Sequence, residues 1–358
     1  MAENLEIMLD KGIIDSNVRE YTKLQTPREL LNEIPVSKEN VEFLYYSRRQ
    51  IKDILDKKDI RKIAIVGPCS IHDVKAGIDY AYKLKILSDK IRDKLLVVMR
   101  TYFEKPRTVL GWTGLIDDPC MDESCKTEIG LRNARLFLKE IIEIRLPCAT
   151  EFVGPIIPQY IGDLISWAAI GARTSESMPH RQLASGLSMP VGFKNSTSGD
   201  VSIAVDAAEC AMHSHSFIGI NLDGNTCIVR TQGNRYSHIV LRGGNGVPNC
   251  SSELVYEALI LQERAGIPKN IIIDCSHGNS EKKYEKQEGV SYLVLDQIKN
   301  RNKDIVGIML ESNLYEGKQD FPKTSKERQN LRYGVSITDG CISWETTERI
   351  LMKYYKAL

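Results

Sequence analysis

Short apolar runs rich in β-branched residues recur along this chain, and each reaches the length of a β-strand. Eight such runs follow residue 60, at 62–67, 95–100, 148–152, 168–173, 191–195, 238–242, 270–275 and 305–311. Their continuous, rather than alternating, apolar character is typical of strands that are buried on both faces.

Stretches with helical spacing lie between most of these runs. Leu84, Leu87 and Ile91 form one apolar face of a helix, and residues 130–144 and 254–265 repeat the pattern. Strands that alternate with helices predict a parallel sheet covered on both faces. Eight units favour a (β/α)8 TIM barrel over a doubly wound sheet, although the order of the strands cannot be read from the sequence.

Two segments do not fit a bare barrel. Residues 1–60 precede the first strand, with Pro27 at a predicted helix start and a longer helix over 38–57. Between the fifth and sixth strands, two strand-like runs flank Asp223-Gly224-Asn225, which is a strong hairpin signal. We therefore expect an N-terminal extension over 1–60 and a catalytic barrel over 61–358, with a β-hairpin inserted near 216–236.

The composition is ordinary for a globular enzyme. The chain has 358 residues, of which 42% are hydrophobic and 27% charged, and its net charge is +1. This balance gives no reason to expect a nucleic-acid partner, and no apolar run reaches the ~18 residues that a membrane span needs. With no secretory signal at its start and nine scattered cysteines, the chain is expected to be cytoplasmic, with reduced thiols.

Four potential metal ligands follow strand ends. Cys69, His277 and Glu311 end or follow the first, seventh and eighth strands, and Asp339 lies in the loop region after the eighth. A closed barrel places its eighth strand beside its first, so the four side chains can converge. Such a set suits Mn²⁺, Fe²⁺, Co²⁺ or Zn²⁺. The alternative is that each is ordinary: a buried thiol, a turn histidine and capping carboxylates.

Four cations also end strands. Arg100, Arg173, Lys194 and Arg242 stand at the ends of the second, fourth, fifth and sixth apolar runs. Because an unpaired buried charge is very costly, each needs an anionic partner, which is either a structural carboxylate or a ligand. Together they can hold a small molecule with two or more negative groups. Lys194 could instead form a Schiff base, as in lysine-dependent aldolases.

The loop after the second strand offers a second phosphate site. Lys105, Pro106, Arg107 and Thr108 place two cations and a hydroxyl on a proline-stiffened turn. Short basic turns are often merely solvated, so the motif is weak alone. Residues 111–119 lengthen this loop, as in active-site lids.

The same segments resemble the type I 3-deoxy-D-arabino-heptulosonate 7-phosphate (DAHP) synthase family. The matching motifs cover nearly the whole chain in order. They include Gly-Pro-Cys-Ser-Ile-His-Asp at 67–73, Lys-Pro-Arg-Thr at 105–108, Gly-Ala-Arg-Thr-Ser-Glu-Ser at 171–177, Pro-Val-Gly-Phe-Lys-Asn at 190–195, Leu-Arg-Gly-Gly at 241–244 and Ser-Ile-Thr-Asp at 336–339. The chain looks like the subgroup with an N-terminal extension and an internal hairpin, in which the extension serves regulation or assembly.

The resemblance implies a condensation of phosphoenolpyruvate with erythrose 4-phosphate, the first step of the shikimate pathway. It implies the following residues by role: metal ligands Cys69, His277, Glu311 and Asp339; phosphoenolpyruvate ligands Arg100, Lys105, Arg173, Lys194 and Arg242; erythrose 4-phosphate ligands Lys105, Pro106, Arg107, Thr108 and Asp339. Lys105, Arg173, Lys194 and His277 would take part in catalysis. A homodimer or homotetramer is also implied.

An aromatic amino acid effector is expected from the same resemblance. The positions it implies are Pro158, Gln159, Leu187, Ser188, Phe217 and Gly219, and they do not decide between phenylalanine, tyrosine and tryptophan. One departure stands out, because the family pattern leads us to expect an Asp near Gly154, and the segment 152–158 has none.

Three alternatives remain. The first is a sister synthase that uses arabinose 5-phosphate. The motif of that family at this place resembles Lys-Ala-Asn-Arg-Ser, whereas this chain has Lys-Pro-Arg-Thr. A lysine aldolase would need no metal. An amino-acid sensor on an inactive barrel would need neither the metal ligands nor the cations.

Overall fold

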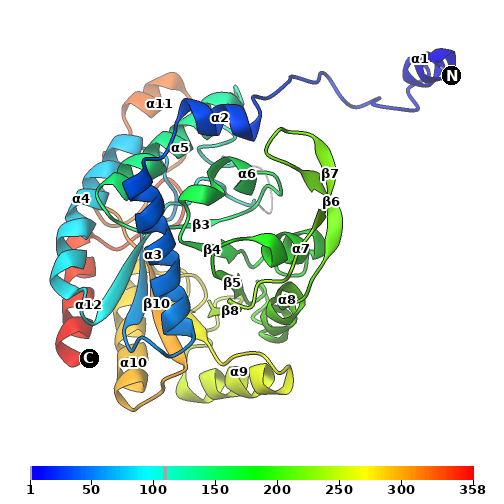
Figure 1. Ribbon diagram of the computed structural model, residues 1–358. Helices are drawn as coiled ribbons and strands as arrows, with labels where there is room; N and C mark the ends of the chain where they lie inside the picture. The colour runs from blue at the N-terminus through cyan, green and yellow to red at the C-terminus, as the bar shows by residue number, and fades with distance from the viewer. Residues whose placement is uncertain (1, 108–110) are drawn as a thin grey trace.

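Eight parallel strands close into a barrel, which confirms the predicted (β/α)8 TIM fold (Figure 1). The computed structural model describes residues 2–107 and 111–358. The barrel strands are β1 (Lys62–Gly67), β2 (Leu95–Arg100), β3 (Cys148–Glu151), β4 (Trp167–Ile170), β5 (Val191–Lys194), β8 (Ser237–Leu241), β9 (Ile271–Asp274) and β10 (Ile305–Glu311). Each begins and ends within three residues of a predicted run.

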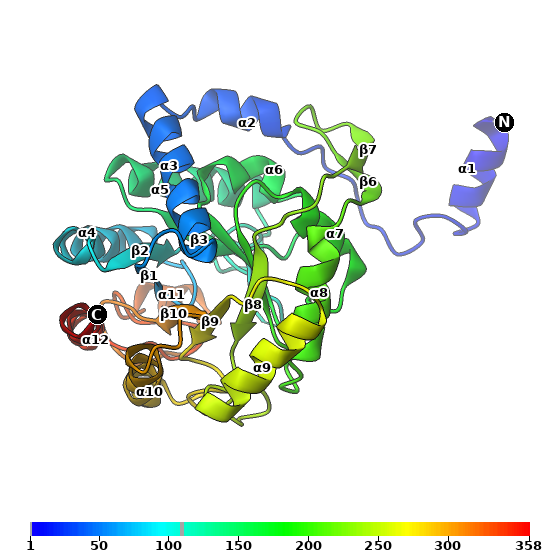
Figure 2. The same ribbon diagram turned by 60° about the horizontal axis from the view of Figure 1, so that its bottom comes forward.

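The strands lie around the barrel in chain order, and β10 returns to pair with β1, where Gly67 stands opposite Glu311. Helices surround the barrel, as Figure 2 shows. They are α4 (Val74–Ile91), α5 (Thr127–Glu143), α6 (Pro158–Ile161), η1 (Gly162–Leu164), α7 (Met178–Gly186), α8 (Ser202–Met212), α9 (Ser252–Arg264), η2 (Tyr284–Lys286), α10 (Gln287–Lys299), α11 (Ser325–Gln329) and α12 (Trp344–Ala357).

Each strand is apolar on both faces because both are buried. Ile63 and Ile65 of β1 point into the barrel, whereas Ala64 and Val66 belong to the cluster that packs on the outer helices. Trp167 fills part of the interior, and a Cβ atom at Gly192 would lie only 2.4 Å from its ring. A glycine on β5 is therefore needed to make room for this indole.

The N-terminal extension forms α1 (Ala2–Asp10), α2 (Pro27–Glu33) and α3 (Lys38–Leu55). Figures 1 and 2 both show α1 standing away from the barrel at the end of an extended segment. In contrast, Ile51 and Ile54 of α3 belong to the same apolar cluster as the inward-facing strand residues. Asn270, just before β9, donates to the backbone carbonyl of Leu55 (3.1 Å). Helix α3 therefore closes the amino-terminal end of the barrel and is part of its core.

The inserted hairpin is formed by β6 (Ser216–Ile220) and β7 (Thr226–Arg230), which pair in antiparallel register. Its turn contains Gly224 with φ +75°, as the Asp-Gly-Asn signal predicts. The tip docks on α2, where the Arg28 backbone N–H donates to Leu222 O (2.8 Å) and its guanidinium pairs with Asp223. The hairpin thus joins the N-terminal extension to the barrel (Figure 1).

All nine cysteines are free thiols, as expected. Over the residues that are described, no helix combines the length and the apolarity that crossing a membrane requires.

Two arginines fasten the N-terminal helices to the segment between α6 and β4. The buried Arg135 of α5 donates to Ile34 O (3.1 Å) and Tyr160 O (3.0 Å), and it pairs bidentately with Asp163 (2.7 and 2.9 Å). Arg48 of α3 donates three further hydrogen bonds to backbone carbonyls of the same segment. These contacts satisfy carbonyls that would otherwise be buried without partners.

We expect Arg135→Ala to lower the free energy of unfolding by about 2–4 kcal/mol, because it leaves buried carbonyls unpaired while Asp163 stays partly exposed. Denaturant unfolding followed by circular dichroism measures this loss. The control is Arg28→Ala, which breaks an exposed ion pair and should change stability little. Equal effects of the two substitutions would contradict the role of Arg135.

Candidate active site

A cavity of about 470 Å³ opens at the carboxyl ends of the strands. Its lining residues are Lys105, Pro106, Arg107, Glu151, Ala172, Arg173, Lys194, Arg242, Ser276, His277, Lys282, Lys283, Tyr284, Glu285, Lys318, Thr338, Asp339 and Gly340. Eight of the expected site residues are among them, whereas Thr108 lies outside the described residues. Cationic side chains outnumber acidic ones around this cavity, so its field favours anionic ligands.

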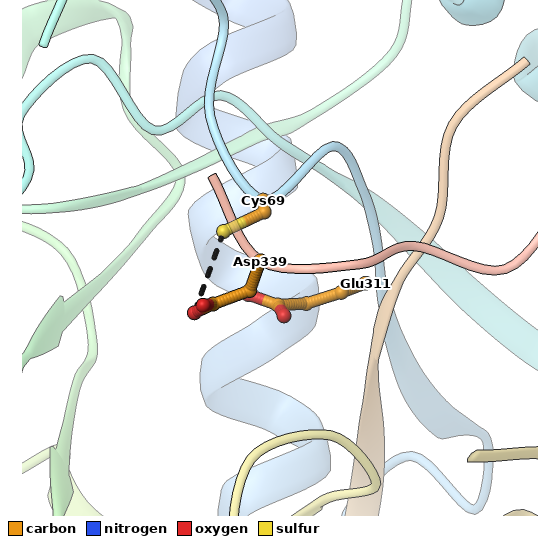
Figure 3. A group of neighbouring side chains, drawn as sticks. All are labelled: Cys69, Glu311 and Asp339. Atoms are coloured by element: carbon orange, nitrogen blue, oxygen red, sulfur yellow. Dashed lines mark hydrogen bonds between the residues drawn. The ribbon is translucent and has the colours of Figure 1, made fainter. Parts of the chain in front are cut away.

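Cys69, Glu311 and Asp339 form a compact group beside the cavity. One ligand atom from each lies within 4.8 Å of the others, and Figure 3 shows the three side chains converging from separate segments. The closing pair β1–β10 brings Cys69 and Glu311 together, and the loop after β10 supplies Asp339. His277 is the fourth expected ligand, and its Nε2 lies 3.6 Å from Glu311 Oε1.

The environment of His277 fits a metal ligand. Its Nδ1 lies 2.9 Å from Asp274 Oδ2, although the angle is not that of a hydrogen bond. A carboxylate behind one ring nitrogen leaves Nε2 facing Glu311, which is the arrangement that most metal-bound histidines show. The donor set of one sulfur, one nitrogen and two carboxylates therefore suits a borderline divalent metal.

The ionisation of this group also favours a cation. Burial would raise the pKa of Glu311, but His277, Arg100 and Lys105 together lower it to about 2. Burial, with a further contribution from Glu311, raises the pKa of the Cys69 thiol to about 11. A divalent cation between them would stabilise the thiolate, which is the form that binds metal.

Two of the four strand-end cations have structural carboxylate partners. Arg100 pairs with Glu311 (3.0 Å), is completely buried and lies beneath the cavity rather than in its wall. Lys194 lies 3.7 Å from Glu151 and 3.4 Å from Asp274. Ion pairing on two sides suits a fixed cation better than the free amine nucleophile of a Schiff-base enzyme.

Arg173 and Arg242 line the cavity wall. Among the residues that the structure describes, the Arg242 guanidinium donates to the carbonyl of Gly243 (3.4 Å), and no ion pair joins it to a carboxylate. The predicted position of Arg173 at a strand end is wrong, because β4 ends at Ile170 and Arg173 lies in the following turn. The turn begins at Gly171, whose carbonyl accepts the backbone N–H groups of residues 174 and 175.

An aromatic ring lies among three of the cations. The ring centre of Tyr102 is 4.0 Å from Arg100, 5.6 Å from Lys105 and 5.7 Å from Lys194. The negative face of the ring attracts nearby cations without neutralising them. The ring therefore helps to hold the three cations close together without reducing their positive charge.

The loop that carries Lys105 and Arg107 is held by hydrogen bonds between its two sides. Lys105 N–H donates to Thr113 O (2.7 Å), and Arg107 Nε donates to Trp112 O (2.7 Å). Trp112 in turn stacks on Phe321, with ring centres 6.3 Å apart. Lys105 Nζ reaches Cys69 Sγ (3.1 Å), so this loop joins the cation set to the metal group.

Gly154, near which an Asp was expected, makes room for the buried carboxyl of Glu104. Glu104 accepts the backbone N–H groups of Gly154 (2.7 Å) and Val153 (3.2 Å). A Cβ at position 154 would approach Glu104 Oε1 to 3.0 Å and Ile157 to 2.8 Å. Burial raises the pKa of Glu104 to about 8 in spite of these two donors. The loops after β2 and β3 are thus joined next to Lys105.

The sequence profile of the DAHP synthetase I family matches residues 33–352. The chain belongs to this family. A tyrosine-sensitive phospho-2-dehydro-3-deoxyheptonate aldolase of Salmonella typhimurium is 47% identical over 335 residues, covering 94% of this chain and 93% of that enzyme. A phenylalanine-inhibited enzyme of Saccharomyces cerevisiae is 44% identical over 345 residues, covering 95% and 93%. The solved structure of the Francisella tularensis aldolase has a TM-score of 0.92 at 45% identity, covering 95% of this chain and 98% of that one.

The six positions expected to bind an effector in this DAHP synthetase I chain come from three segments, and two of the positions lie on the hairpin itself. Phe217 and Gly219 are on β6, Pro158 and Gln159 begin α6, and Leu187 and Ser188 follow α7. Asn234, between the hairpin and β8, donates to Leu187 O (3.2 Å). Ser188 lines a cavity of about 440 Å³ against α3. The other five are not among the residues that line this cavity.

Several residues of the site were missed by sequence reasoning. Glu151 and Asp274 are acidic residues that end two buried and otherwise uncharged strands, β3 and β9, and that pattern is a signal of buried ion pairing. Lys282, Lys283 and Lys318 also line the cavity, but they come from loops without a local signature.

We expect Cys69→Ala to lose tight Mn²⁺ binding while the barrel stays folded, because the cluster loses its thiolate. Equilibrium dialysis followed by metal analysis measures the bound Mn²⁺, and circular dichroism checks the fold. Cys250→Ala, at another buried cysteine, is the control and should bind Mn²⁺ normally. Undiminished binding by Cys69→Ala would contradict the metal assignment.

Proposed function

We propose that this chain condenses phosphoenolpyruvate with D-erythrose 4-phosphate to give DAHP and inorganic phosphate, the first step of the shikimate pathway. The observation that carries the proposal is one cavity bounded by both a metal-ligand group and a set of cations. Membership of the DAHP synthetase I family supports the same reaction, as do relatives that are named phospho-2-dehydro-3-deoxyheptonate aldolases and match nearly the whole chain.

Within this cavity, Lys105, Arg173, Lys194 and Arg242 would surround the phosphate and carboxylate of phosphoenolpyruvate, with Arg100 supporting them from below. Arginine forks hold such anions bidentately. Pro106, Arg107 and Thr108 would hold the aldose phosphate at the mouth. Fixing both substrates side by side makes their reaction effectively unimolecular.

Cys69, His277, Glu311 and Asp339 would hold Mn²⁺, Fe²⁺, Co²⁺ or Zn²⁺, which when bound supplies Lewis-acid polarisation of the aldehyde. Carbon C3 of phosphoenolpyruvate attacks the aldehyde carbon, water then adds at C2, and phosphate leaves by C–O cleavage. The Lys105 ammonium would protonate the aldehyde oxygen as negative charge develops there, and its position 3.1 Å from the Cys69 sulfur, beside the metal ligands, supports this role.

An aromatic amino acid would inhibit this reaction, since relatives at similar identity are named as tyrosine-sensitive and phenylalanine-inhibited. The six expected positions would bind the effector: Pro158, Gln159, Leu187, Ser188, Phe217 and Gly219. The N-terminal extension over residues 1–60 would support regulation and assembly as a homodimer or homotetramer. The docking of the hairpin tip on α2 supports a connection between the extension and these positions.

The decisive assay follows phosphate release from phosphoenolpyruvate with erythrose 4-phosphate or arabinose 5-phosphate, with and without chelator and each aromatic amino acid. We expect phosphate release when the sugar phosphate is erythrose 4-phosphate and not when it is arabinose 5-phosphate. The activity should be lost on chelation and recovered when Mn²⁺ is added. Preference for arabinose 5-phosphate would identify the sister synthase. Activity that survives chelation would favour a lysine aldolase, and background release under all conditions would favour a sensor.

We expect Arg173→Ala to raise the KM for phosphoenolpyruvate by about tenfold or more, because a charge-assisted contact to the substrate is lost. The KM for erythrose 4-phosphate should change less. Steady-state kinetics with each substrate varied in turn measures both values. An unchanged KM for phosphoenolpyruvate would contradict the assignment of Arg173.

A further inference from the structure

Three buried asparagines lie at the carboxyl ends of three neighbouring barrel strands. Asn195 follows β5, Asn249 lies in the loop after β8, and Asn279 lies in the loop after β9. Their exposed fractions are 0%, 8% and 2%. No step of the proposed chemistry uses them, and a buried amide is tolerated only where its hydrogen bonds are satisfied.

The three side chains form one connected network. Asn249 Nδ2 donates to Asn195 Oδ1 (3.1 Å), and the Asn249 backbone N–H donates to Asn279 Oδ1 (2.7 Å). Gly243 is held from both sides, since its N–H donates to Asn249 Oδ1 (2.8 Å) and its carbonyl accepts from Asn195 Nδ2 (3.0 Å). Asn279 Nδ2 donates to carbonyls at the ends of β8 and β9 (3.1 and 2.9 Å).

This network fixes the backbone of Arg242. The Arg242 N–H donates to Asn195 Oδ1 (2.8 Å). Its carbonyl accepts from Gly278 N–H (2.9 Å) and Asn279 N–H (3.2 Å). Both backbone polar groups of Arg242 are therefore held by neighbouring loops, and its guanidinium starts from a fixed point on the cavity wall.

The same scaffold holds two more residues of the site. Lys194 directly precedes Asn195, and His277 directly precedes Gly278. The loops touch backbone to backbone, since a Cβ on Gly278 would lie 2.6 Å from the carbonyl carbon of Gly243. A shift of one loop would therefore be transmitted to the other.

We propose that Asn195, Asn249 and Asn279 are positioning residues that fix Lys194, Arg242 and His277 relative to one another. The inference rests on the proposed function, in which these three groups hold phosphoenolpyruvate and the metal. Amides suit this task because each can donate and accept at once, so one side chain joins two loops. They also add no charge to a cavity whose cations must face anionic substrates.

The test uses Asn249→Ala, because Asn249 is not among the residues that line the cavity. The matched control is Asn234→Ala, at the amino end of β8. Asn234 is 7% exposed, and its amide donates to the carbonyls of Ala184 and Met189 (3.3 and 2.9 Å). Both substitutions should lower thermal stability. Only Asn249→Ala should raise the KM for phosphoenolpyruvate, by about tenfold, because small displacements of substrate-binding groups are costly.

Asn249→Asp is the conservative variant and the one to measure if the alanine variant does not fold. It keeps the acceptor for Gly243 N–H and loses the donor to Asn195, so an intermediate rise in KM is expected. In an Arg242→Ala background, Asn249→Ala should add less than about twofold, since its effect through Arg242 is already lost.

Equal changes in KM for Asn249→Ala and Asn234→Ala would overturn the positioning role, as would full additivity with Arg242→Ala. Failure of the proposed function is a different result, in which the unsubstituted protein does not release phosphate from the two substrates. Calorimetric titration with phosphoenolpyruvate alone then still compares the variants. Equal affinities there would also overturn the proposal.

Discussion

The parallel pairing of the first barrel strand with the last is the constraint on which the site depends. β1 and β10 come from distant parts of the chain, and their register sets Gly67 opposite Glu311. A slip of one residue would turn Glu311 to the outer face of the barrel. The cluster of Cys69, Glu311 and Asp339 exists only because this seam closes in one register.

Charge compensation is the second organising principle of the barrel mouth. Arg100 and Lys194 are neutralised by carboxylates within the protein, so the cost of burying them is met before any ligand arrives. Arg242 has no such partner in the described part of the chain, although its backbone is rigidly held. The folded protein thus combines cations whose charge is already compensated with Arg242, which no described carboxylate pairs, and this is a form of electrostatic preorganisation.

The sequence was sufficient to predict the helices and strands and most candidate residues, because strands buried on both faces appear in the sequence as continuous apolar runs. It was insufficient wherever contacts join distant segments. The role of α3 as a barrel plug depends on Ile51 and Ile54 meeting strands that follow later. The lysines at 282, 283 and 318 reach the cavity through irregular loops, and Arg173 lies beyond its strand because a turn begins at Gly171. Glu151 and Asp274 were predictable in position, but their ion pairs with Lys194 required the closed barrel.

The plug formed by α3 has a consequence for the order of events during synthesis. This helix leaves the ribosome before any strand, yet the interior that it covers is complete only when β10 has paired with β1. At typical translation rates the intervening residues take roughly 10 to 50 s to appear. Throughout that interval Ile51, Ile54 and Leu55 lack part of their apolar cluster, because Val306 and Met309 of β10 have not yet been made. Helix α3, in the N-terminal extension, is therefore among the last parts of the chain to reach its complete native environment.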